Sequence, residues 1–190
     1  MKRSLGARTL VVPTPVWVVG TYDSEGRPNA MTAAWGGVCC SKPPCVYVSL
    51  RKATQTYWNI NARGAYTVSV PGEEHVAEAD FFGTASGRDV DKFAATGLTP
   101  VRSELVDAPY VVEFPLVLEC RVRQVVELGL HTQFIGEIVD VKAEDSILTE
   151  DGAPDIWKIR PIIYSPGNRE YGSTGERLGT AFKIGEEFSA

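Results

Sequence analysis

The chain of 190 residues has the length of one domain, and its 44% hydrophobic and 23% charged residues are typical of a globular protein. A net charge of −5 argues against a nucleic-acid partner, because phosphate binding favours a basic surface. No apolar run approaches the roughly 20 residues of a membrane helix, and the start lacks a signal-peptide cleavage site. We therefore expect a single cytoplasmic domain over residues 1–190, with no membrane partner.

Strand signals dominate the first third of the chain. Apolar and β-branched residues predict strands over 9–22 and 29–40, joined by the turn DSEGRP with its glycine at position 26. After the turn SKPP, the alternating segment CVYVSLRK predicts another strand. Thr54 and Gly64 have the positions of an N-cap and a C-terminal glycine, which predicts a short helix between them. The segment AYTVSV then predicts a further strand.

The rest of the chain mixes helix and strand. The apolar spacing over 73–97 predicts a helix, a loop and a short helix. Long strands are expected over 110–128, with Pro115 at an edge or bulge, and over 131–145. The segment from residue 157 predicts a short strand followed by a glycine-rich loop. The expected core therefore covers about residues 10–172, and residues 173–190 form a tail.

The predicted fold class is mainly β with inserted helices. Neighbouring strands are too closely spaced for the crossover connections that parallel strands require. A closed or partly closed Greek-key barrel is the natural architecture for such a chain. Neither GxGxxG after a first strand nor a GK[ST] phosphate loop is present, so a classical dinucleotide fold is not expected.

Three of the four cysteines lie within seven positions. Cys39 and Cys40 are adjacent in a predicted strand, so their side chains point to opposite faces and cannot bind one metal ion. Cys40 and Cys45 form a C-x4-C pair across a stiff turn, and neither histidine is near. No CxxC motif supports a redox pair. We interpret the cysteines, Cys120 included, as small buried side chains in strands and expect no metal site.

Two neighbouring segments have the features of a ligand site. Small residues around Trp35 would let a planar ligand approach the backbone closely. The strand ending in Ser49 and Arg51 leads directly to the helix start with Thr54 and Thr56. A helix N-terminus with hydroxyls and a guanidinium beside it suits phosphate. Each segment alone has an ordinary explanation: Trp35 could be a core residue, and the charged end of the strand could simply be solvated. Together they indicate a ligand with a flat ring and a phosphate.

Four segments occur in an order that resembles a known family. They are PVWVVGTYDSEGRPNAMTAAW, PPCVYVSLRKATQTYWNI, SGRDVDKF and HTQFIGEIVDV. This order resembles the flavin reductase-like, FMN-binding split-barrel proteins, and within them most of all the flavoredoxins. The resemblance implies a homodimer of split β-barrels that binds FMN at or near the dimer interface.

The resemblance also implies roles for particular residues. The segment 29–35 would line the flavin and its ribityl chain, and Arg51 would lie among the phosphate ligands. Lys92 and His131 would be the catalytic residues near the isoalloxazine, where a cation stabilises the charge of reduced flavin and an imidazole exchanges a proton. The full set of expected cofactor-binding residues is Asn29, Ala30, Met31, Thr32, Ala33, Ala34, Trp35, Cys40, Ser49, Leu50, Arg51, Thr54, Thr56, Ser86, Lys92, His131, Tyr164 and Tyr171.

The predicted function is that of a flavin-dependent oxidoreductase. Bound FMN would move electrons from NAD(P)H or a protein donor to a small-molecule or protein acceptor. Two alternatives remain open at this point: a flavin-binding electron carrier without turnover, and a split-barrel binding module without cofactor. The phosphate-binding set around Arg51 argues against the second alternative, because a scaffold has no need of it.

Overall fold

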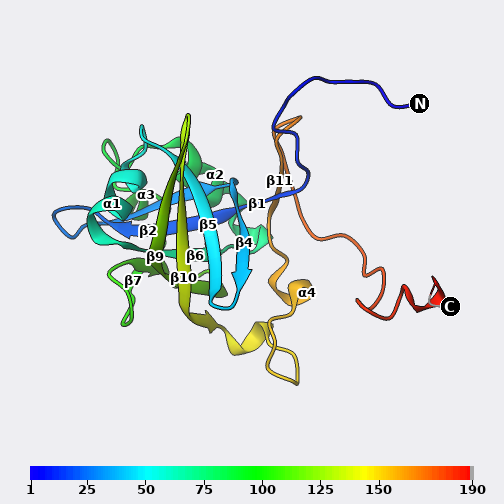
Figure 1. The fold of residues 1–190 in the computed structure, drawn as a ribbon. Helices are drawn as coiled ribbons and strands as arrows, with labels where there is room; N and C mark the ends of the chain where they lie inside the picture. The colour runs from blue at the N-terminus through cyan, green and yellow to red at the C-terminus, as the bar shows by residue number, and fades with distance from the viewer. Residues whose placement is uncertain (189–190) are drawn as a thin grey trace.

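Seven strands form one antiparallel sheet in the computed structural model, which describes residues 1–188. Their order across the sheet is β3 (Pro28–Ala33), β2 (Trp17–Tyr22), β6 (Ala65–Val70), β9 (Leu116–Leu128), β10 (His131–Ala143), β5 (Pro44–Arg51) and β4 (Gly36–Ser41). The two end strands, β3 and β4, follow each other in the chain, so the link at positions 34 and 35 joins the two ends of the sheet. The N–H of Ser49 donates to the carbonyl of Trp35 at 2.8 Å, which extends the β4–β5 pairing up to this link. The predicted split barrel is confirmed (Figure 1).

The inside of the barrel is a hydrophobic core built by alternation along the strands. In β5, Val46, Val48 and Leu50 are buried in this core. Because successive strand residues point to opposite faces, Ser49 and Arg51 point away from the core. The core also holds Tyr66, whose hydroxyl donates to the carbonyls of Val46 and Phe134 at 3.2 and 3.3 Å. The strand pattern thus decides which side chains of β5 remain available for a ligand.

Helix α1 (Gln55–Arg63) begins and ends where the sequence predicts. The Thr54 side chain accepts a hydrogen bond from the N–H of Tyr57, and Gly64 adopts the left-handed conformation with φ 64°. Helix α2 (Val76–Thr84) follows the 3-10 turn η1 (Glu73–His75) and packs on β3. Helix α3 (Lys92–Thr96) is capped by Asp91 and packs on α2 through Phe82 and Phe93. The predicted helix, loop and short helix are therefore confirmed.

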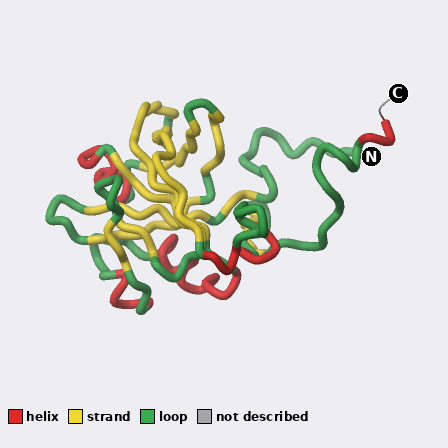
Figure 2. The backbone as a smooth tube through the Cα atoms, turned by 90° about the horizontal axis from the view of Figure 1, so that it is seen from below, coloured by secondary structure: helices red, strands yellow, loops and turns green. Residues whose placement is uncertain are grey.

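Smaller elements surround the barrel. Strands β1 (Thr14–Pro15), β11 (Ile163–Ser165) and β12 (Glu170–Gly172) form a three-stranded sheet, and β7 (Pro100–Arg102) pairs with β8 (Pro109–Val111). The remaining elements are η2 (Asp145–Ile147), α4 (Ile156–Ile159) and η3 (Glu186–Phe188). Both terminal segments extend away from the barrel on the side of β11 (Figures 1 and 2). No helix within residues 1–188 has both the length and the apolar character needed to cross a membrane.

Several predicted boundaries are wrong. The expected strand 29–40 is two strands, because the chain crosses between the sheet ends at Trp35. The expected strand 9–22 begins only at residue 14 and changes sheet at Val16, after two closely spaced prolines. Pro115 lies between β8 and β9, where its carbonyl accepts from the N–H of Glu144 at 2.9 Å. Residues 156–159 are helical, and residues 189–190 of the predicted tail lie outside the described residues.

The interpretation of the cysteines is half wrong. Cys45 and Cys120 are buried strand residues, as expected. Cys39 and Cys40 are exposed, because β4 is an end strand with little packed against it.

Candidate functional site

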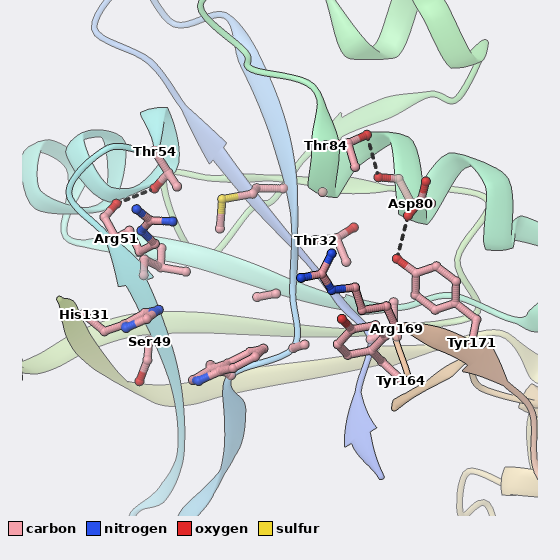
Figure 3. Close-up of a pocket in the computed structure, with 17 residues that line it drawn as sticks. Thr32, Ser49, Arg51, Thr54, Asp80, Thr84, His131, Tyr164, Arg169 and Tyr171 are labelled. Carbon is pink, nitrogen blue, oxygen red and sulfur yellow. Dashed lines mark hydrogen bonds between the residues drawn. The ribbon is translucent and has the colours of Figure 1, made fainter. Parts of the chain in front are cut away.

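A cavity of about 500 Å³ lies beside the closure of the barrel, within the range of small-molecule sites. Its walls come from β3, the link to β4, the end of β5, the start of β10, helix α2 and the β11–β12 hairpin (Figure 3). It is lined by Val16, Met31, Thr32, Ala33, Ala34, Trp35, Ser49, Leu50, Arg51, Thr54, Asp80, Gly83, Thr84, His131, Tyr164, Arg169 and Tyr171. Most of the residues expected from the sequence are therefore brought together here.

One wall combines aromatic rings with a cation. In the β5–β10 pairing, His131 lies directly opposite Arg51, so strand register places these side chains together. The rings of Trp35 and His131 are parallel within 1°, with centroids 6.3 Å apart. Figure 3 shows Arg51, Thr54 and His131 on the same side of the cavity. This wall presents a flat aromatic surface beside a guanidinium.

The opposite wall is closed by the β11–β12 hairpin. Tyr164 pairs with Tyr171 across the hairpin, and their ring centroids are 5.6 Å apart. The Tyr171 hydroxyl donates to a carboxylate oxygen of Asp80 at 2.8 Å, which ties the hairpin to α2. Burial, together with this hydrogen bond, raises the pKa of Tyr171 above its ordinary value, so the hydroxyl remains a donor at neutral pH.

A smaller cavity of about 180 Å³ adjoins the large one and shares Met31, Thr54, Gly83 and Thr84 with it. Four more of the expected residues line it: Asn29, Thr56, Ser86 and Lys92. The amide nitrogen of Asn29 donates to the Thr56 hydroxyl at 3.0 Å. The amide oxygen of the same Asn29 is buried and has no partner among the described residues. The small cavity thus offers a polar lining with one unused acceptor.

The structure places Lys92 in the small cavity, not in the large one. Its ammonium group is buried and donates to the carbonyls of Ala30 and Phe82, both at 2.8 Å. Burial lowers the pKa of Lys92 from 10.5 to about 8, because it penalises the charged form. Lys92 therefore links β3 to α2, and a catalytic role for it stays a prediction.

Two expected residues line neither cavity. Ala30 is fully buried in β3, in a hydrophobic cluster that also contains Phe82 and Phe93. Cys40 is exposed on β4, where it pairs with Cys45 of β5. Cys40 lies near the end of β4 that is farther from Trp35, outside both cavities, so the expectation that it could reach the ligand is not supported.

Five residues that line the large cavity were missed by the sequence analysis: Val16, Asp80, Gly83, Thr84 and Arg169. Three of them belong to α2, which reaches the cavity only because it docks on β3. Arg169 lies in the hairpin loop with a left-handed backbone, φ 60°. Nothing in the local sequence around it indicates a ligand site.

We expect Gly87→Ala to disturb the small cavity. A Cβ at position 87 would lie 2.0 Å from the amide oxygen of Asn29, so Asn29 must move and its bond to Thr56 is lost. Overpacking of this kind costs about 1–2 kcal/mol, which urea denaturation would measure. Gly175→Ala is the matched control, because its Cβ would meet nothing within 4 Å. Equal unfolding midpoints for both variants would contradict the expected contact.

Comparison with known proteins agrees with this architecture. Residues 8–173 match the flavin reductase like domain. The chain is 56% identical to the flavoredoxin of Desulfovibrio vulgaris (Miyazaki F), with a TM-score of 0.93 over 97% of this chain and 100% of that one. It is 28% identical to the flavoredoxin from Methanosarcina acetivorans, with a TM-score of 0.91 over 99% of this chain and 100% of that one.

A further relative is an NADH:riboflavin 5'-phosphate oxidoreductase from Streptomyces pristinaespiralis. It is 29% identical over 132 residues, which cover 70% of this chain and 72% of the relative. The domain match covers most of the chain, and the solved structures share the barrel over nearly its whole length. The chain therefore belongs to the flavin reductase-like family, as the sequence resemblance predicted, and is a flavin-binding redox protein of that family.

Proposed function

We propose that the protein binds FMN across the two joined cavities and acts as a flavin-dependent oxidoreductase. The observation that carries this proposal is the pairing of a large cavity having a flat aromatic wall with a small polar cavity at the start of α1. The electron donor in this proposal is NAD(P)H or a protein. The printed name of the Streptomyces relative, an NADH:riboflavin 5'-phosphate oxidoreductase, supports the nicotinamide donor.

The donors and acceptors of the site fit FMN. The first N–H groups of the nine-residue helix α1 have no carbonyl partner within the helix, which favours an anion at this end. Arg51 and the Thr54 hydroxyl are beside it, at the large cavity. The unpaired oxygen of Asn29 requires a donor, and the ribityl hydroxyls of FMN can supply one.

The chain's own residues would hold and shield the cofactor. Bound flavin supplies the transfer of electrons, which the side chains of the protein cannot provide themselves. Trp35 and His131 present the flat wall, and Tyr171, anchored by Asp80, closes the opposite side against water. The ring nitrogens of His131 can donate or accept a hydrogen bond at the edge of the cavity.

We also propose that the working unit is a homodimer. The C-terminal segment carries large apolar side chains that meet almost nothing in the single chain, with Phe182 100%, Leu178 88% and Phe188 85% exposed. Exposed apolar surface of this kind is typical of contact with another protein. Light scattering during gel filtration measures the mass directly. A monomer at micromolar concentration would contradict this part of the proposal.

The decisive experiment is an absorption spectrum of the purified protein, followed by titration of the flavin-free protein with FMN, FAD and riboflavin. Anaerobic addition of NADH or NADPH then tests the donor. We expect a bound flavin that a nicotinamide bleaches. A bound flavin that neither NADH nor NADPH reduces would favour an electron carrier that receives its electrons from a protein donor. Failure to bind any flavin would overturn the proposed function.

A further inference from the structure

A second cleft, of about 820 Å³, lies directly beside the large cavity. The N-terminal residues 7–10 form one side of it, and the β11–β12 hairpin forms the other. Trp35, Tyr164 and Arg169 line both the cleft and the large cavity, so these three side chains form the boundary between the two spaces. A molecule held in the cleft can therefore contact whatever occupies the large cavity.

The cleft is positively charged in an acidic protein. Its lining contains Arg8 and Arg169 but no aspartate or glutamate, whereas the whole chain has a net charge of −5. Among the described side chains, neither guanidinium takes part in an ion pair or a side-chain hydrogen bond. The neighbouring Glu170 accepts a hydrogen bond from Asn168 instead. Two arginines with unused donors suit a phosphate or a carboxylate, which a guanidinium can bind through two hydrogen bonds.

The hairpin directs Arg169 towards the boundary. The loop closes through a hydrogen bond from the Arg169 N–H to the Ser165 carbonyl at 2.8 Å. Within it Arg169 adopts a left-handed backbone, φ 60°, which is unfavourable for a residue with a Cβ atom. Figure 3 shows its side chain extending from the Tyr164 side into the large cavity. An unfavourable conformation that aims a cation at a cavity is typical of a functional position.

We propose that this cleft binds the small-molecule redox partner of the flavin by an anionic group, a phosphate or a carboxylate, held by Arg169 and Arg8. The apolar body of that molecule lies against Trp35 and Tyr164, and its reactive end enters the large cavity. This inference rests on the proposed flavin function and adds the chemical class and the anchoring residues of the partner.

The test uses the FMN-loaded protein and isothermal titration with two probes, sodium pyrophosphate and sodium benzoate. Asparagine tolerates the left-handed conformation better than most residues, so Arg169→Asn removes the charge without new backbone strain. We expect wild type to bind at least one probe and Arg169→Asn to bind it about tenfold more weakly. Arg8→Gln should show a smaller loss, and Arg169→Lys a partial recovery. Arg3→Gln, in the same N-terminal segment but outside both cavities, is the matched control and should bind like wild type.

The two probes separate the two sources of the anion. A loss confined to pyrophosphate assigns the cleft to a nucleotide donor, and a loss confined to benzoate assigns it to an organic acid acceptor. Absence of binding by wild type, or equal binding by wild type and Arg169→Asn, would overturn the inference. The flavin spectrum of each sample keeps the two proposals distinct. If FMN stays bound but wild type and Arg169→Asn bind the probe equally, only the proposed anion site in the cleft is refuted. If wild type does not retain FMN, the proposed function itself is refuted.

Discussion

Arg51→Ala should weaken FMN binding about ten- to a hundredfold and leave riboflavin binding nearly unchanged. Arg51 is the last residue of β5 and lines the large cavity, and it lies shortly before Thr54, the N-cap of α1. Loss of a charge-assisted hydrogen bond to phosphate costs roughly 1.5–3 kcal/mol, which corresponds to this range of affinity. Riboflavin has no phosphate, so it cannot lose this contact. Fluorescence titration of the flavin-free protein with both ligands measures the difference.

The neighbouring lysine supplies the control. Lys52 is exposed and paired with Glu127 at 2.8 Å, outside the cavity, so Lys52→Ala should leave both affinities unchanged. Equal losses for FMN and riboflavin in Arg51→Ala would show that Arg51 supports the shape of the site and does not bind the phosphate.

Lys92 should make the stability of the flavin-free protein rise with pH above 8. Its pKa is about 8 in the folded protein and 10.5 in an unfolded chain, so between these values the unfolded state binds more protons. Stability then increases by about 1.4 kcal/mol per pH unit from this group. Relative to Lys92→Met, wild type should gain about 2 kcal/mol in the free energy of unfolding between pH 7 and pH 9.5. Below pH 8 the lysine is charged in both states and the difference stays constant.

The comparison with a variant removes the effect of other groups that titrate in the same range. Burial raises the pKa of the Cys120 thiol to about 12, and such groups lower stability at high pH in both proteins alike. Lys52→Met provides a further control. The hydrogen bond to Glu127 raises the pKa of Lys52 above its ordinary value, the opposite direction to Lys92, so wild type should show no such gain in stability relative to Lys52→Met. A constant difference between wild type and Lys92→Met from pH 7 to 9.5 would mean that the ammonium is not desolvated.

These two predictions concern the two ends of the proposed ligand site. Arg51 lies at the large cavity and Lys92 at the small one, and Thr54 borders both. If Arg51 alone binds the phosphate, Lys92 affects the ligand only through the positions of β3 and α2, which it joins. The pH dependence of Lys92 is therefore measurable without any flavin present.

The sequence by itself determined the features that depend on short-range interactions. Thr54 and Gly64 bound α1 because capping involves only residues within one turn. Alternation in β5 placed Ser49 and Arg51 on the face away from the core, since the strand period is two residues. Together with the order of four motifs, these local rules predicted the split barrel and most of the residues around the large cavity.

Only the tertiary structure decided which distant segments share the site. Arg169 reaches the cavity because β11 pairs with β1 across most of the chain, and no local pattern records such a pairing. Lys92 has the sequence of a solvated helix residue, yet the packing of α2 and α3 on β3 buries it against two carbonyls. Contacts of this kind depend on how whole helices and strands pack against one another. Local propensity and the spacing of residues along the chain do not predict such long-range packing. Strand register and helix docking therefore set the final geometry of the site.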